Sequence, residues 1–517
     1  MSFRDRLPSR RVVLLATASA VMMLFAYPPA SLVLPSFVVL VPLLFALEEL
    51  RDSGTAGQRG GARAVWLGWW FGVFNHGLTL YWMIIALWHF TKISALGYAA
   101  SVLIVLSPQW ALAAWIVHRT STRTRIPLWV SFPLVWTAVE WLQGHYGDLR
   151  FPWLGLGSSL QRVTMLVQWA DIGGARGITL WLAWINVMVF LALRRSTWKP
   201  LVPVAATLLL ALGYGAWRER TLVMRPVAKV AVLQPNVGFE ERRTERESVA
   251  LLNQLLTMSR QAFADSSVRL VAWPEAAIPD YMFRHRDWAD SIARVAREAG
   301  RPLLAGGLDA EFDQQGRGVG FNAAFFYDGT GFLRLPIYHK KYLVPIVERV
   351  PFVNPRWFKN LRWFGGFGKG DKFPVYRIAD GGFGVLICYE SAFQDLSRNY
   401  RRDGADFLVN ITNDGWYGRT WAPAQHAGHL VMRAIETRVG IARAANTGIS
   451  EFVDPLGHVH LPTELNTERT ESSAVMTTDV RTLYVRLGDW VALVAIVGAI
   501  ACLAASYIRK EPVEGTA

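Results

Sequence analysis

Three residues of this 517-residue chain combine the side-chain types that acyl transfer requires: Cys388, Glu275 and Lys340. Each ends or follows a run that predicts a strand, and open α/β sheets place their sites at strand ends. A thiol is mostly protonated at neutral pH and needs a base or a nearby cation. A partly buried carboxylate can take its proton, and an ammonium can stabilise the thiolate and the oxyanion formed at an ester carbonyl. The three types suit transfer through a thioester, but spacing alone does not bring them together.

The only other cysteine, Cys502, lies in a long apolar run that predicts a membrane span. The two cysteines are therefore expected in different environments, where they would not pair. An unpaired thiol in a domain that faces an oxidising compartment needs a reason, and nucleophilic chemistry is one. From position alone, the alternative for Cys388 is a small buried apolar side chain, the commoner fate of a free cysteine.

The composition is that of a membrane protein with a globular insert. Hydrophobic residues make up 52% of the chain and charged residues only 18%, below the roughly 25% of an ordinary soluble protein. The apolar residues concentrate in 12–217 and 486–507, whereas 226–480 resembles a globular domain long enough to bury its own core. The net charge of +14 could indicate nucleic acid, but the basic residues form no stripe. We therefore expect no nucleic-acid partner.

Eight apolar runs are long enough to cross a bilayer. They lie near residues 12–29, 31–48, 65–88, 95–118, 126–143, 173–193, 200–217 and 486–507. Basic residues flank alternate loops, so the positive-inside rule places both termini in the cytoplasm. The expected organisation is seven transmembrane helices in 1–217, an extracytoplasmic catalytic domain in 218–485, and an eighth helix with a cytoplasmic tail in 486–517. A cleaved signal peptide is the alternative for the first run, but its loss would break the charge alternation.

The middle stretch alternates strands with helices and then pairs strands, which predicts a layered α/β domain with a mixed sheet. Strands are predicted at 227–233, 268–273, 302–308, 373–378, 383–388, 406–410, 440–445 and 449–453. Helices are predicted at 245–263, 287–299, from about 391, and at 424–438. Residues 322–327 and 332–337 predict a hairpin around Asp328-Gly329.

The motifs that carry the three candidate residues resemble the nitrilase, or carbon–nitrogen hydrolase, superfamily. They are Trp273-Pro274-Glu275, Lys340 followed by Leu343-Val344-Pro345, and Cys388-Tyr389-Glu390. The membrane half, with Glu140-Trp141 and Phe151-Pro152-Trp153-Leu154-Gly155, is similar to the apolipoprotein N-acyltransferase family of bacterial inner membranes. The resemblance implies an α-helical transmembrane bundle plus a nitrilase-like α-β-β-α sandwich, with the catalytic domain facing the periplasm.

The resemblance also implies a two-step reaction. The thiol takes a fatty acyl chain from a phospholipid of the bilayer and passes it to the N-terminal amine of a diacylated apolipoprotein. By motif, Glu275 is the general base, Lys340 the oxyanion stabiliser and Cys388 the nucleophile. Glu348, Tyr389 and Glu390 are supporting residues, and no cofactor or metal is expected. The chain departs from the family at Pro345-Ile346-Val347-Glu348, which lacks a glycine, and at residues 237–239, where the family often has a tryptophan.

Residues 351–370 mix aromatic and basic side chains, which suits the headgroup layer of a bilayer. Four aromatic residues of this stretch are predicted to gate lipid entry to Cys388: Trp357, Phe358, Trp363 and Phe364. The alternative is an ordinary core segment. The weaker candidates are a Cys388–His339 pair, and a metal at His426 and His429, for which no further ligands are evident.

Two other functions remain open from the sequence. One is a membrane-anchored amidase or nitrilase that acts on a small carbon–nitrogen substrate. The other is a transporter with a non-catalytic binding domain, but few ionisable residues lie within the predicted spans, which argues against it.

Overall fold

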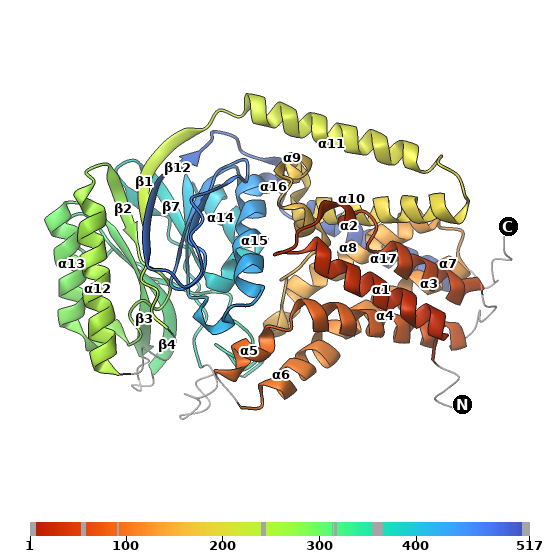
Figure 1. The fold of residues 1–517 in the computed structure, drawn as a ribbon, viewed down its shortest axis with the longest axis horizontal. Helices are drawn as coiled ribbons and strands as arrows, with labels where there is room; N and C mark the ends of the chain where they lie inside the picture. Colours follow the sequence, from red (N-terminus) through yellow and green to blue (C-terminus); the bar gives the residue numbers. More distant parts are fainter. Residues whose placement is uncertain are drawn as a thin grey trace. The chain divides into compact units, whose positions relative to one another are not determined.

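The computed structural model describes residues 7–52, 58–89, 92–238, 244–312, 314, 318–353 and 366–508. The chain divides into two compact units. The helical unit comprises residues 1–84, 93–220 and 487–517, and the sheet unit comprises residues 85–92 and 221–486. Figure 1 shows the helices and strands of both units.

The helical unit contains several helices that could cross a membrane. Five described segments are long and apolar enough: Val33–Asp52, Ser94–Arg123, Ala170–Arg194, Leu201–Thr221 and Trp490–Ile508. The other three predicted spans also form helices, namely α1 (Arg10–Ala26), α4 (Gln58–Thr79) and α8 (Leu128–His145). The expectation of about eight spans is therefore not confirmed. Helix α1 has only 17 residues, and α8 has 18 with Pro133 inside it.

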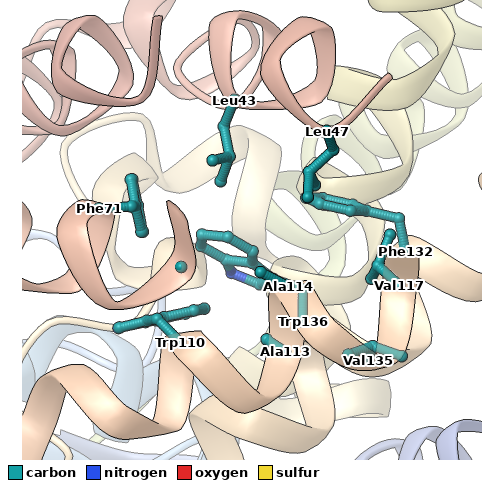
Figure 2. Close-up of a pocket in the computed structure, with 11 residues that line it drawn as sticks. Leu43, Leu47, Phe71, Trp110, Ala113, Ala114, Val117, Phe132, Val135 and Trp136 are labelled. Atoms are coloured by element: carbon teal, nitrogen blue, oxygen red, sulfur yellow. The ribbon is translucent and has the colours of Figure 1, made fainter. Parts of the chain in front are cut away.

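Helices α4 and α7 (Ser107–Arg123) pack closely because Gly68 has no side chain. A Cβ at Gly68 would lie 2.2 Å from the Trp110 carbonyl oxygen, and small residues allow such close approach in membrane helices. Nearby, Leu43 and Leu47 of α3 (Val41–Asp52) point toward Trp136 and Phe132 around a small apolar cavity (Figure 2). The interior of this unit is thus mainly hydrocarbon and aromatic.

One buried polar set in the helical unit is centred on Glu140. Glu140 accepts hydrogen bonds from Arg176 at 2.9 Å, Thr179 at 2.8 Å and the Leu156 backbone N–H at 2.7 Å. These contacts tie α8 and α10 (Ala170–Arg194) to the segment that follows residues 151–155. The Glu140 carboxylate is satisfied by its neighbours, so its role here is to fix that segment.

Among the described residues, the sheet unit forms two six-stranded sheets, in the orders β12-β1-β2-β3-β4-β5 and β11-β10-β9-β8-β7-β6. The first is built from β1 (Arg225–Gln234), β2 (Val268–Ala272), β3 (Leu303–Phe312), β4 (Gly318–Tyr327), β5 (Tyr338–His339) and β12 (Arg469–Thr477). The second is built from β6 (Tyr376–Ile378), β7 (Gly381–Ile387), β8 (Phe407–Thr412), β9 (Gly440–Ala445), β10 (Glu451–Val453) and β11 (Val459–His460). Strands β1-β2-β3 and β7-β8-β9 run parallel.

Helices cover the outer faces of the two sheets, and the inner faces meet. Helices α12 (Glu245–Ala264) and α13 (Arg286–Ala299) pack apolar residues on the first sheet. Helices α14 (Gln394–Arg402) and α15 (Ala422–Thr437) pack on the second (Figure 1). Between the sheets, Phe326 of β4 and Phe383 of β7 have ring centroids 5.3 Å apart. The unit is the expected α-β-β-α sandwich.

The predicted hairpin around Asp328-Gly329 forms its turn, but its second half is shorter than expected. Leu333 makes one antiparallel bridge to Tyr327 of β4, and the Arg334 N–H donates to the Phe326 carbonyl at 2.8 Å, but residues 332–337 form no regular strand. Strand β4 pairs along its length with β3 and, at its edge, with the two-residue β5. Pro336 has no N–H to donate to a ladder, which disfavours a regular strand there. The chain resumes a strand at Tyr338, which places Lys340 directly after β5.

Glycine 306 in β3 allows the loop after β2 to approach the sheet. A Cβ at this position would lie 2.2 Å from the Pro274 carbonyl oxygen and 2.9 Å from the Glu275 Cα. Any side chain at residue 306 would push the loop that carries Glu275 away. Only the backbone fits here.

Candidate active site

Cys388 lies at the end of β7, where the chain turns into a short 3-10 helix over Cys388–Ala392. Its φ of +52° lies in the left-handed region, which is rare for a residue with a side chain. Such strain persists only where the surroundings fix it, and it clusters at functional sites. The thiol is fully buried. The sulfur thus lies at the end of a parallel strand, as the sequence pattern predicts.

Lys340 lies between two carboxylates. Its Nζ is 3.1 Å from Glu275 Oε1 and 2.9 Å from Glu348 Oε1. Asn322 of β4 donates to the same two oxygens, at 2.7 and 3.0 Å. The second oxygen of each carboxylate accepts a backbone N–H, from Asn413 for Glu275 and from Val344 for Glu348. The structure therefore joins Glu275, Lys340 and Glu348 in one buried cluster.

The charges of this cluster act on the thiol. Burial opposes the positive charge of Lys340, but Glu275 and Glu348 outweigh it and hold the pKa of Lys340 well above its usual value. Burial and the charge of Glu275 raise the pKa of Cys388, while Lys340 lowers it. The net effect keeps the resting sulfur protonated. Glu275 and Lys340 are thus electrostatic neighbours of Cys388, as the acyl-transfer hypothesis requires.

Glu390 anchors the turn that carries Cys388. One of its oxygens accepts the backbone N–H of Lys341 at 2.7 Å and of Tyr342 at 3.2 Å. The other accepts the Tyr338 hydroxyl and the Ile387 N–H, both at 2.7 Å. Burial raises the pKa of Glu390 to about 7, although these donors favour the ionised form. The side chain ties the end of β7 to the segment that follows β5.

The turn before Glu348 forms without the expected family glycine. Ile346 adopts a φ of +71°, and its N–H donates to the Arg349 carbonyl at 2.8 Å. The Glu348 N–H donates to the Val344 carbonyl at 3.0 Å. The left-handed residue is thus 346, one position before the residue that stands in place of the glycine. The missing glycine does not displace Glu348 from Lys340.

Comparison with known proteins extends over both units. Residues 19–188 match the family described as apolipoprotein N-acyltransferase N-terminal domain, and residues 229–497 match carbon–nitrogen hydrolase. A protein of Geobacter metallireducens named apolipoprotein N-acyltransferase is 31% identical, over 98% of this chain and 97% of the relative. Proteins of the same name from Chlorobaculum tepidum and Bradyrhizobium diazoefficiens are each 28% identical, over 83% and 97% of this chain and over 83% and 96% of their own lengths.

The chain belongs to the apolipoprotein N-acyltransferase family. The family resemblance read from the motifs is therefore confirmed.

Several other candidate residues of this N-acyltransferase family member are not part of the cluster around Lys340. Tyr389 is buried and packs edge-on against Phe393, with ring centroids 5.1 Å apart. The four proposed gating residues lie outside the described part of the chain: Trp357, Phe358, Trp363 and Phe364. Phe239, which follows Gln234-Pro235-Asn236, also lies outside it. His339 contacts Asp309 at 2.7 Å and stacks on Phe321. The alternative Cys388–His339 pair is not what the described contacts show.

Sequence reasoning missed two polar groups of the site. The sequence pattern predicts Asn322 only as the start of a strand, although its side-chain amide donates to both carboxylates. Asp414 lies just after β8 and is buried beside His426 and Arg443. Its Oδ1 lies 2.9 Å from His426 Nδ1, and its Oδ2 accepts a hydrogen bond from Arg443 at 2.9 Å. The rule that picked out the other strand ends would have found Asp414. His426 thus has a carboxylate partner.

The Glu390 anchor predicts a graded loss of stability. Glu390→Gln should destabilise the sheet unit by about 1–3 kcal/mol, because an amide nitrogen would face a buried N–H donor. Tyr338→Phe removes one of the four donors and should cost about 1 kcal/mol. Thermal unfolding in detergent measures both. Equal Tm values for Glu390→Gln and the unaltered protein would show that the anchor does not hold the turn.

Proposed function

We propose that this protein transfers a fatty acyl chain from a membrane phospholipid, through a Cys388 thioester, to the N-terminal amine of diacylglyceryl-cysteine in apolipoproteins. The observation that carries the proposal is a buried thiol on a strained strand end beside a Lys340 that two carboxylates hold. Membership of the family and the apolar helices of the helical unit support an acyl donor drawn from a bilayer.

In the first step, Glu275 takes the thiol proton as Cys388 Sγ attacks the ester carbonyl carbon of the phospholipid. Lys340 stabilises the oxyanion of the tetrahedral intermediate. The carbon–oxygen bond of the ester then breaks. The departing alkoxide takes the proton from Glu275 and leaves as a lysophospholipid, while the acyl chain remains on sulfur.

In the second step, the N-terminal amine of the apolipoprotein attacks the thioester carbonyl. Glu275 takes a proton from the attacking nitrogen, and the carbon–sulfur bond breaks as the amide forms. The thiolate then recovers the proton from Glu275. Each half-reaction returns Glu275 to its ionised state, so one carboxylate serves both acid and base roles.

Two carboxylates around one ammonium suit this cycle. When Glu275 is protonated, Lys340 keeps an ionised partner in Glu348 at 2.9 Å. An unpaired buried ammonium would carry the desolvation cost of a lone charge. Glu348, itself held by the Asn322 amide, can therefore keep Lys340 in place while Glu275 changes its charge. In this proposal, Glu348 positions and Glu275 transfers protons.

We further propose an inner-membrane location, with residues 218–485 facing the periplasm. The basic residues in alternate loops support it. In a Cys502→Ala background, Ser266→Cys should react with a membrane-impermeant maleimide in intact spheroplasts. Ser196→Cys should react only after permeabilisation. Both serines are exposed, so access to the protein surface does not bias the comparison. The reverse labelling pattern would overturn the orientation.

The thioester itself is directly measurable. Purified protein incubated with phospholipid in detergent should gain the mass of one acyl chain on Cys388, and Cys388→Ala should show no gain and no transfer to peptide. Cys502→Ala is the matched control and should acylate normally. Full transfer activity in Cys388→Ala would end the proposal.

Substitution of Glu275 and of Glu348 should slow thioester formation to different extents. Glu275→Gln should slow thioester formation by about 10²–10⁴-fold, as expected for loss of a general base. Glu348→Gln keeps an oxygen near Lys340 and should slow it by only about tenfold, since a neutral acceptor binds a cation more weakly. Rapid-quench mass spectrometry gives both rates, with Tm as the folding control. Equal losses would refute the division of roles.

A further inference from the structure

A second buried polar cluster lies beside Cys388, at the end of the neighbouring strand. Strands β7 and β8 are parallel, and Ile387 pairs with Ile411. Thr412 is the next residue of β8, and Cys388 is the first residue after β7, so the two occupy neighbouring strand ends. Thr412 is fully buried, and its hydroxyl hydrogen-bonds to Asp414 Oδ1 at 3.1 Å. That hydroxyl is also a hydrogen-bond partner of the Cys388 side chain.

Asp414 is held from the other side by two buried side chains. Arg443 of β9 donates to Asp414 Oδ2 at 2.9 Å, and His426 of α15 lies 2.9 Å from Oδ1. Arg443 is itself fixed by Asn410 Oδ1 at 2.5 Å and the Ile449 carbonyl at 2.9 Å. Both members of the Arg443–Asp414 pair have fully buried side chains. Such pairs add little net stability, so a positional role better explains this one.

A threonine hydroxyl has one hydrogen and two lone pairs. When it donates to Asp414, its lone pairs can accept the S–H of a resting thiol. When the sulfur is a thiolate, rotation of the same hydroxyl lets it donate to sulfur instead. A hydrogen bond to an ionised acceptor is about twice as strong as a neutral one. The hydroxyl can therefore follow the charge of the sulfur without any movement of the backbone.

We propose that Thr412, aimed by Asp414, is a hydrogen-bond switch for Cys388 that accepts from the thiol and donates to the thiolate. The inference rests on the proposed thioester chemistry and adds to it. Thr412 would stabilise sulfur as the nucleophile of the first step and as the leaving group of the second. Asp414 is a positioning residue, and Arg443 and His426 hold it. No covalent bond forms on any of the four.

Two neighbours on the same strand end should act on the sulfur in opposite directions. The Thr412 hydrogen bond lowers the pKa of Cys388, whereas the negative charge of Asp414 raises it. The pH dependence of the sulfur's reaction also depends on the charged or titratable groups around it and around its partners: Glu275, Lys340, Glu348, Glu390, Asp414, Tyr417, His426, His429, Arg443 and Glu451. The variants below leave these groups in place, apart from the one that removes the charge of Asp414.

The test is the pH dependence of single-turnover thioester formation with phosphatidylethanolamine in detergent. Thr412→Val keeps the shape of the side chain and removes the hydroxyl. It should slow the reaction about tenfold at neutral pH and shift the rising limb of the rate–pH profile to higher pH by about one unit. Thr412→Ser should restore the rate and the limb. Thr477→Val is the matched control, at a buried strand position whose hydroxyl has no partner among the described residues.

For Asp414→Asn we expect the opposite shift of the rate–pH profile. This second variant still tests the proposal if Thr412→Val folds poorly. It should move the limb toward lower pH, because the charge that opposes the thiolate is gone. General damage to the site would slow both variants without opposite shifts. A Thr412→Val profile that coincides with that of the unaltered protein would overturn the switch and leave the proposed function intact. Absence of any thioester in the unaltered protein would instead overturn the proposed function.

Discussion

The ammonium of Lys340, buried between Glu275 and Glu348, is the contact on which the site depends. Taking these charges out of water costs several kcal/mol for each ion, so the cluster is tolerable only if every oxygen has a partner. Asn322 and two backbone N–H groups complete that requirement. The polar lining of the site is therefore a set of shared contacts, in which Lys340 and Asn322 donate to the same two carboxylate oxygens.

The sandwich brings these groups together because its strands end near one another. Glu275 follows β2, Lys340 follows β5 and Cys388 follows β7, with Asp414 just after β8. The first two strands belong to one sheet and the last two to the other. The Asn413 N–H donates to Glu275 and so joins the end of β8 to the loop after β2. Close packing of the two sheets is what turns four separate strand ends into one site.

In the proposed mechanism, the groups around the sulfur have two different roles. Glu275 transfers protons and Lys340 stabilises negative charge on the reacting atoms. Thr412, aimed by an Asp414 that Arg443 holds, follows the charge of the sulfur. Glu390 accepts hydrogen bonds from four donors and has a structural role, because it holds the turn that carries Cys388.

The sequence by itself determined the elements and the family. Alternating apolar runs predicted β1, β2, β7, β8 and β9 closely, because period-two patterns and glycine or proline stops are local signals. The same patterns could not reveal that Asn322 bridges two carboxylates, or that Asp414 is buried with Arg443 beside the end of the strand that precedes the sulfur. Those facts are contacts between residues far apart in the chain. Only the packing of two sheets decides them, since burial removes the water that would otherwise satisfy each group.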